Sequence, residues 1–137
     1  MEVKISHLDG VKFSIQARSH SIVCDQPLDN GGADSGMTQP ELLLASLGAC
    51  AAYYAQQYLK LHNLAQGGVE VSVSAEKLSQ PARLGNFHVR VMSPVPLSAE
   101  QAEGIRRSVQ RCLIHNTLLS PPEIRVDLTV NTASVVS

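Results

Sequence analysis

Apolar and polar residues alternate in three short runs at the start of the chain. Residues 2–8 and 11–17 flank Asp9-Gly10, a dipeptide typical of tight hairpin turns, and a third run covers residues 20–25. Because successive side chains of a strand point to opposite faces, each run predicts a strand with one apolar face. We therefore expect a small antiparallel meander here.

A polar loop, residues 26–37, separates these strands from the longest apolar run of the sequence. Thr38 and Glu41 have the spacing of a capping box, in which each side chain accepts a hydrogen bond from the other residue's main-chain N–H at the start of a helix. Residues 42–55 are apolar almost all the way round a helical projection. We predict a helix from Thr38 to about His62, roughly 36 Å long and buried on most sides.

The second half of the chain returns to alternation. Residues 69–77 and 87–92 predict two antiparallel strands joined by a polar turn. Ser98 begins a second capping-box pattern, and an apolar stripe extends that helix to about Leu119. Residues 123–130 alternate again and predict a last strand.

The predicted order of elements is βββ-α-ββ-α-β. Because strands and helices fall in separate groups, an α+β fold with antiparallel sheets is favoured over a parallel wound sheet. The 137 residues, 44% hydrophobic and 17% charged, fit one globular domain spanning residues 1–137.

Charge and composition exclude several classes of function. A net charge of -1 gives no basic footprint for nucleic acid or an anionic membrane surface, and aromatic residues make up only 4%. The longest apolar run is shorter than the roughly 20 residues that a membrane-spanning helix needs. The N-terminus lacks the apolar segment of a signal peptide, and three cysteines, an odd number, favour thiols in a reducing cytoplasm.

Two of these cysteines lie on the predicted core helices. Cys50 falls in the middle of the first helix, and Cys112 lies on the apolar stripe of the second. Each fits simple core packing, but a thiol near a cation can also act as a thiolate nucleophile. If the helices cross at these positions, a disulfide becomes feasible once the Cα atoms come within about 7 Å.

A metal site is a weaker interpretation of the same region. His115 follows Cys112 by three residues, and His20 and Cys24 could supply further ligands. A structural zinc site usually needs four ligands, often in paired motifs that this chain lacks. We expect no metal or cofactor, and we interpret His20 and Cys24 as ordinary strand residues.

Arg18 and Glu41 are candidate partners of a thiol site. Arg18 ends the second predicted strand, where it is either solvated or placed to stabilise a thiolate and orient a peroxide. Glu41 already has a role in the capping box. Glu41 and Cys50 point to opposite faces of a straight helix and lie some 13–14 Å apart along its axis. A site that uses both side chains would therefore be built from two chains.

The sequence "RSHSIVCDQPLDNGGADSGMTQPELLLASLGAC", followed by "VEVSV" and later by "RCLIHNTL", resembles the OsmC/Ohr family of osmotically inducible and organic hydroperoxide resistance proteins. The resemblance spans roughly residues 3–130. It implies an intertwined homodimer with two active sites at the subunit interface. Cys112-Leu113 stands where many relatives have Cys-Pro. The "CxxHxTL" form and the "RxH…DQP" segment are more similar to the broad OsmC-like branch of the family than to the dedicated organic hydroperoxide reductases.

The resemblance also implies a role for each candidate residue. Cys50 matches the peroxidatic thiol, which attacks a hydroperoxide, becomes a sulfenic acid and releases the alcohol. Cys112 matches the resolving thiol, which then forms a disulfide with Cys50. Glu41 matches a glutamate that positions the arginine of the site, for which Arg18 is the best match. A lipoyl-type dithiol would reduce the disulfide.

Two functions compete on this basis. The first is a thiol-dependent peroxidase of oxidative stress defence, acting on organic hydroperoxides in an apolar pocket. The second is a non-enzymatic OsmC-like dimer that binds a small apolar or thiol-bearing ligand, with inert cysteines. The peroxidase requires the two sulfurs to lie within a few ångströms of each other, in a cavity with an arginine. The residues expected to line such a pocket are Leu42, Leu43, Leu47 and Tyr53 or Tyr54.

Overall fold

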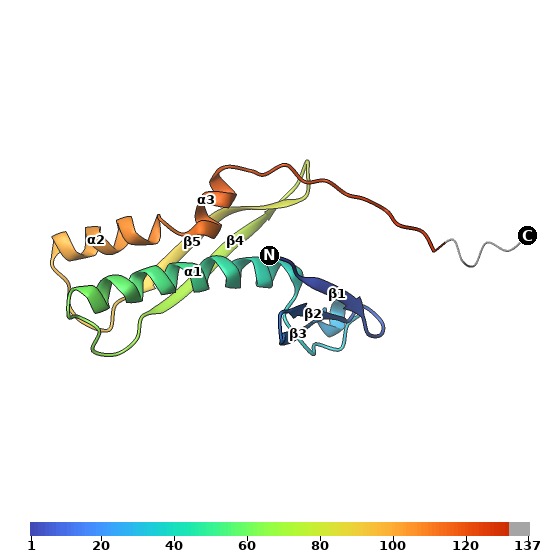
Figure 1. Ribbon diagram of the computed structural model, residues 1–137, viewed down its shortest axis with the longest axis horizontal. Helices are drawn as coiled ribbons and strands as arrows, with labels where there is room; N and C mark the ends of the chain where they lie inside the picture. Colours follow the sequence, from blue (N-terminus) through green and yellow to red (C-terminus); the bar gives the residue numbers. More distant parts are fainter. Residues whose placement is uncertain (132–137) are drawn as a thin grey trace, which may run out of the picture.

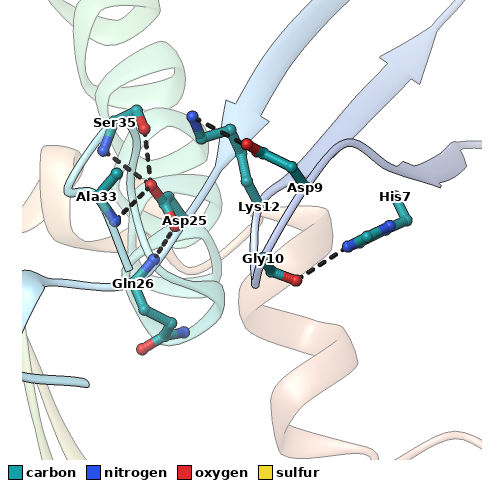
Figure 2. A network of polar contacts seen from close by, with 8 residues as sticks. All are labelled: His7, Asp9, Gly10, Lys12, Asp25, Gln26, Ala33 and Ser35. Atoms are coloured by element: carbon teal, nitrogen blue, oxygen red, sulfur yellow. Dashed lines mark hydrogen bonds and ion pairs between the residues drawn. The ribbon is translucent and has the colours of Figure 1, made fainter. Parts of the chain in front are cut away.

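The N-terminal meander forms as predicted. The structure is a computed structural model that describes residues 1–131. Its first sheet has the antiparallel order β1-β2-β3, with β1 at Lys4–His7, β2 at Phe13–Ala17 and β3 at His20–Cys24 (Figure 1). In the turn between β1 and β2, the ring Nε2–H of His7 donates to the Gly10 carbonyl at 2.9 Å (Figure 2).

One face of this sheet is apolar and is covered only in part, since Cys24 at one end of it is buried. Ile15 lies opposite Ile5 on one side and Ile22 on the other. Side chains directly opposite one another project from the same face. Ile5 and Ile22 nevertheless stay 57% and 49% exposed. The apolar face that the sequence pattern predicts to be buried is therefore exposed to solvent at Ile5 and Ile22.

A buried carboxylate organises the loop between this sheet and the long helix. Asp25 is 1% exposed. It accepts hydrogen bonds from the Ser35 hydroxyl at 2.7 Å and from the main-chain N–H groups of Ser35, Gln26 and Ala33 (Figure 2). These bonds, led by the Ser35 hydroxyl, hold the pKa of the Asp25 carboxyl well below its ordinary value of 3.8. The loop, which includes a short 3-10 turn (η1, Leu28–Asn30), is thus anchored at several points.

The long helix α1 runs over Gln39–Leu61, close to its predicted bounds, and Thr38 and Glu41 form the predicted capping box. It packs against the hairpin of β4 (Glu70–Leu78) and β5 (Arg83–Met92), which forms the second sheet (Figure 1). Helix α2 (Ala99–Val109) packs on α1, and both contribute to a small core. The buried members of this core are Ala55, Leu59 and Ile105.

The second predicted helix is two helices, which corrects the expectation of a single helix to Leu119. Helix α2 ends at Val109, and α3 covers Leu113–Leu119. Between them, Cys112 has an extended backbone with φ −59° and ψ 130°, which interrupts the helix. Its side chain accepts a hydrogen bond from the third residue of the new helix, so Cys112 is the N-cap of α3 rather than a mid-helix residue.

The predicted last strand is wrong for this chain. Residues 121–131 belong to neither helix nor strand, and they extend away from the body of the molecule (Figure 1). The side chains of Ile124, Val126 and Leu128 are 80–88% exposed. The alternation is suitable for a strand, but a strand forms only beside a partner, and this segment lies beside none. The α+β class with antiparallel sheets is confirmed, in the order βββ-α-ββ-α-α.

Candidate active site: a disulfide between two helices

The structure joins the two cysteines of the core helices in a disulfide. Cys50 lies in the middle of α1, and Cys112 precedes α3. Their Cα atoms are 5.8 Å apart, within the usual range for a disulfide. The remaining cysteine, Cys24, is a buried free thiol at the end of β3, so its assignment as a strand residue is confirmed.

The two sulfurs have different surroundings. Cys112 has an exposed fraction of 0%, whereas Cys50 is half-buried. The main-chain N–H of His115 donates to the sulfur of Cys112 at 3.3 Å. The C-x-x-H spacing thus corresponds to an N-cap and the third residue of a helix. The contact to the sulfur comes from the backbone of His115, not from a metal-binding imidazole.

A cavity of about 360 Å³ lies beside the disulfide, between α1, α2 and β5. Cavities of this size are typical of small-molecule sites. Most of its wall is apolar, and the polar groups that border it come from β5, α2 and the α2–α3 region. The apolar residues include Leu47, Ala51, Val89, Val91, Leu97, Ile105 and Val109, next to Cys112; the polar ones are Ser93, Arg106, Gln110 and His115.

The arginine beside this cavity is Arg106. Its guanidinium forms an ion pair with Glu103 one turn earlier on α2. Arg18, the arginine expected from the sequence, lies exposed in the β2–β3 turn and is not among the cavity-lining residues. Arg106 precedes Val109 and the C-cap residue Gln110 by three and four residues, so these side chains lie on one side of the C-terminal end of α2.

Glu41 is also placed away from the cavity. Its carboxylate accepts hydrogen bonds from the Thr38 hydroxyl at 2.8 Å and the Thr38 N–H at 3.0 Å, which lower the pKa of Glu41. It borders a separate open groove with Val71 and Val73 of β4. In a single chain the structure therefore bonds Cys50 to Cys112. Of the four predicted site residues only Cys112 borders the cavity, and Cys50, Arg18 and Glu41 are not among its lining residues.

The predicted apolar lining is met in part. Leu47 borders the cavity beside the disulfide, whereas Leu43 lines a neighbouring hollow with Phe87. Tyr53 and Tyr54 line an open groove on the side of α1 that faces Arg107 of α2. Val89 and Val91 of β5 stand in the cavity wall where the sequence suggested tyrosine.

Within residues 1–131, no three His, Cys, Asp or Glu side chains are grouped so that they could hold a metal ion. In the same part of the chain, no helix is both long enough and apolar enough to span a membrane. The candidate chemistry therefore centres on the cysteine pair and the cavity beside it.

A model of the family described as OsmC-like protein matches residues 31–127, which include both cysteines of the disulfide. The chain belongs to the OsmC-like family. No curated protein matches the sequence. The match of the family model begins in the loop anchored by Asp25 and ends within the extended C-terminal segment, so it covers every element that borders the cavity.

Solved structures of other OsmC-like proteins share the fold. A protein of Psychrobacter arcticus assigned to the osmotic stress and detoxification response superimposes with a TM-score of 0.76 at 17% identity, covering 84% of this chain and 85% of that one. An OsmC-like protein of Mycoplasma pneumoniae gives 0.65 at 20% identity, covering 88% and 89%. The organic hydroperoxide resistance protein OsmC of Legionella pneumophila gives 0.59 at 14% identity, covering 86% and 89%. At these identities the likeness shows the fold.

Proposed function

We propose that this OsmC-like protein is a thiol-dependent peroxidase that reduces organic hydroperoxides to alcohols. The observation that carries the proposal is the Cys50–Cys112 disulfide beside an apolar cavity bordered by Arg106. A disulfide between two core helices, next to a cavity that can hold a small molecule, is the oxidised product that such an enzyme forms in each cycle.

The cycle has three balanced steps. The Cys50 thiolate attacks the distal oxygen of the hydroperoxide, the O–O bond breaks, and the alcohol leaves once its oxygen is protonated. The Cys112 thiolate then attacks the sulfur of the Cys50 sulfenic acid, which forms the disulfide and releases the hydroxyl as water. A lipoyl-type dithiol reduces the disulfide and is itself oxidised to a cyclic disulfide.

The cavity supports an organic substrate. Its walls are mostly aliphatic side chains, which favour an alkyl or aryl group over hydrogen peroxide. Arg106 borders the cavity, and its guanidinium, which pairs with Glu103, would hold a peroxide oxygen or another anionic group there. The Legionella protein is named an organic hydroperoxide resistance protein, and this name supports a role in stress defence. An odd number of cysteines supports a reducing cytoplasm.

We further propose that the protein acts as a homodimer. Its accessible surface is 10586 Å², whereas a compact monomer of this mass exposes about 6,900 Å². The excess, about 3,600 Å² per chain, is larger than the roughly 1,000–2,500 Å² that one protomer contributes to an obligate homodimer interface. The partly exposed face around Ile15 and the exposed apolar segment 123–130 contribute to this excess. In such a dimer, Arg18 and Glu41 of one chain would complete the site of the other.

The peroxidase is tested by consumption of cumene hydroperoxide with dihydrolipoamide as the reductant. We expect wild-type protein and Cys24→Ser to turn over alike, because Cys24 is a buried thiol outside the site. Cys50→Ser should lose turnover. Equal turnover by Cys50→Ser and wild type would remove the basis of the proposal.

The cavity also favours a second candidate, a dimer that binds a small apolar ligand without turnover. In that case the same assay gives no hydroperoxide consumption by any variant. A large apolar side chain in the wall, introduced as Ala51→Phe, should then abolish binding of a hydrophobic fluorescent probe while Ala45→Phe on the opposite groove leaves it intact.

A further inference from the structure

The two sulfurs of the disulfide differ in access and in hydrogen bonding. Cys112 is completely enclosed, with an exposed fraction of 0%, and its sulfur accepts a hydrogen bond from the His115 N–H. Cys50 is half-buried, and no hydrogen bond to its sulfur is present in the described residues, 1–131. A thiol that reduces the pair must reach one sulfur along the line of the S–S bond and expel the other as a thiolate.

Both differences favour the same direction of attack. Access decides which sulfur a thiolate can reach, and of the two residues only Cys50 has exposed surface, whereas no part of Cys112 is exposed. The stability of the leaving thiolate decides which side of the bond breaks away more readily, and a hydrogen-bond donor stabilises a thiolate. The His115 N–H is a main-chain donor fixed by the first turn of α3, so it is already in place when the bond breaks.

We infer that this disulfide is reduced in one direction, with the reductant attacking Cys50 and Cys112 leaving as a thiolate held by the His115 N–H. The reductant thiolate forms a bond to the sulfur of Cys50, and the Cys50–Cys112 bond breaks, with its electron pair passing to Cys112. The second thiolate of the dithiol then attacks the other sulfur of the same dithiol, which is bonded to Cys50 in the mixed disulfide. This closes a cyclic disulfide and releases the Cys50 thiolate, so that two electrons pass from the dithiol to the protein.

The direction has a consequence for the site. Hydroperoxide and reductant would react at the same sulfur, so the two must use the same approach to Cys50 in turn. The identity of the dithiol rests on the proposed function. The direction of attack is a property of the disulfide itself, and it is tested without any hydroperoxide.

The first experiment maps the mixed disulfide. Cys24→Ser protein is oxidised with diamide, treated for a short time with the monothiol 2-mercaptoethanol, and quenched with acid and N-ethylmaleimide. The Cys24→Ser background is needed because Cys24 and Cys50 share the tryptic peptide 19–60. We expect mercaptoethanol on Cys50 and maleimide on Cys112, exceeding the reverse pattern by at least about tenfold. The reverse pattern, or equal amounts of both, would overturn the inference.

The second experiment measures access to each thiol by itself. Reduced Cys24→Ser/Cys112→Ser and Cys24→Ser/Cys50→Ser proteins are reacted with Ellman's reagent, first folded and then in guanidinium chloride. When folded, Cys50 should react at least about tenfold faster than Cys112, and the difference should vanish on unfolding. Equal folded rates would contradict the burial on which the direction rests. A protein without peroxidase activity that passes both experiments would retain this inference and lose only the proposed function.

Discussion

Cys50 and Cys112 are 62 positions apart in the sequence and 5.8 Å apart between their Cα atoms. The segment that the bond closes contains β4, β5 and α2, together with most of the cavity wall. A single covalent bond between α1 and the start of α3 therefore encloses the elements that build the site.

The redox state of this bond should change the stability of the whole fold. Closing a loop of this length restricts the unfolded chain and raises the free energy of unfolding by about 4 kcal/mol in the chain-entropy model. We expect dithiothreitol to lower the midpoint of urea unfolding of the oxidised protein. Cys112→Ser should unfold at the same urea concentration with and without the reductant. An unchanged midpoint for the oxidised wild type would show that the disulfide adds no stability.

Removing the resolving thiol should separate the first turnover from the later ones. In Cys112→Ser, Cys50 can still attack one hydroperoxide, but its sulfenic acid has lost the thiol with which it forms the disulfide and is open to further oxidation. We expect one equivalent of alcohol, then slow cycling and accumulation of sulfinic acid at Cys50. Mass spectrometry of the Cys50 peptide measures this, with Cys24→Ser as the control. Sustained cycling at the wild-type rate would contradict the resolving role of Cys112.

Proline should be tolerated at position 113. Leu113 is the first residue of α3 and is 64% exposed, and the backbone of Cys112 has the extended conformation that a residue before proline prefers. Leu113→Pro should therefore raise stability by about 0.4–1 kcal/mol. Asn116→Pro is the matched control, because it removes the hydrogen bond from the Asn116 N–H to the Cys112 carbonyl and should cost about 3 kcal/mol. Urea unfolding compares the two, and a destabilised Leu113→Pro would contradict the described start of α3.

A side chain at position 104 should disturb the contact between the two long helices. A Cβ atom at Gly104 would lie 2.5 Å from ring carbons of Tyr58, whose ring stacks on His62 with centroids 4.0 Å apart. Overpacking of this kind costs about 1–3 kcal/mol. We expect Gly104→Ala to lower the melting temperature although alanine is the better helix former.

The loss of stability caused by Gly104→Ala should depend on the ring of Tyr58. Leucine at position 58 frees the space beside residue 104, so Gly104→Ala should cost less in the Tyr58→Leu background than in the wild type. Thermal unfolding of the four proteins gives the coupling between the two sites. Equal losses in both backgrounds would place the cause outside this contact.

Acid should destabilise the protein through Asp25. The folded-state pKa of this carboxyl lies below its ordinary value, so its contribution to stability is fully present above about pH 4 and is lost as the pH falls toward the folded pKa. Asp25→Asn keeps the size of the side chain but turns one acceptor into a donor, which faces the N–H groups that now bond to the carboxylate. We expect Asp25→Asn to be less stable than wild type at neutral pH and the two stabilities to converge at low pH.

The measurement is the unfolding free energy from urea titrations between pH 7 and the lowest pH at which the protein still folds. Asp29→Asn, in the same loop, is a control, and it should follow the wild-type pH dependence. Parallel pH curves for Asp25→Asn and wild type would show that Asp25 does not cause the loss in acid.

The sequence predicted the first sheet, α1 and the β4–β5 hairpin because their signals are local: alternation, a hairpin dipeptide and a capping box. It missed the break before α3 because Cys112 stays in phase with the apolar stripe and no proline or glycine marks the interruption. Residues 123–130 do alternate, but a strand also needs a neighbour, and periodicity carries no information on where that neighbour lies.

The site was predicted unevenly for the same reason. Cys50 and Cys112 could be named from the helices that carry them, but the distance between them follows only from how α1 and α3 meet. Arg106 was missed because an arginine on a charged helix face resembles a solvated residue, and its position beside a cavity depends on the packing of α2 on α1.

In the proposed homodimer, the extended segment near the C-terminus would link the stability of this protein to its concentration. Ile124, Val126, Leu128 and Val130 are all at least 64% exposed, and an unpaired segment of this kind can template aggregation. If a second copy covers this segment, dilution separates the two chains and exposes these side chains to water. The stability of each chain then falls. At low concentration the chains would be separate, with the aggregation-prone segment exposed. At high concentration they would pair, and the segment of each chain would be covered.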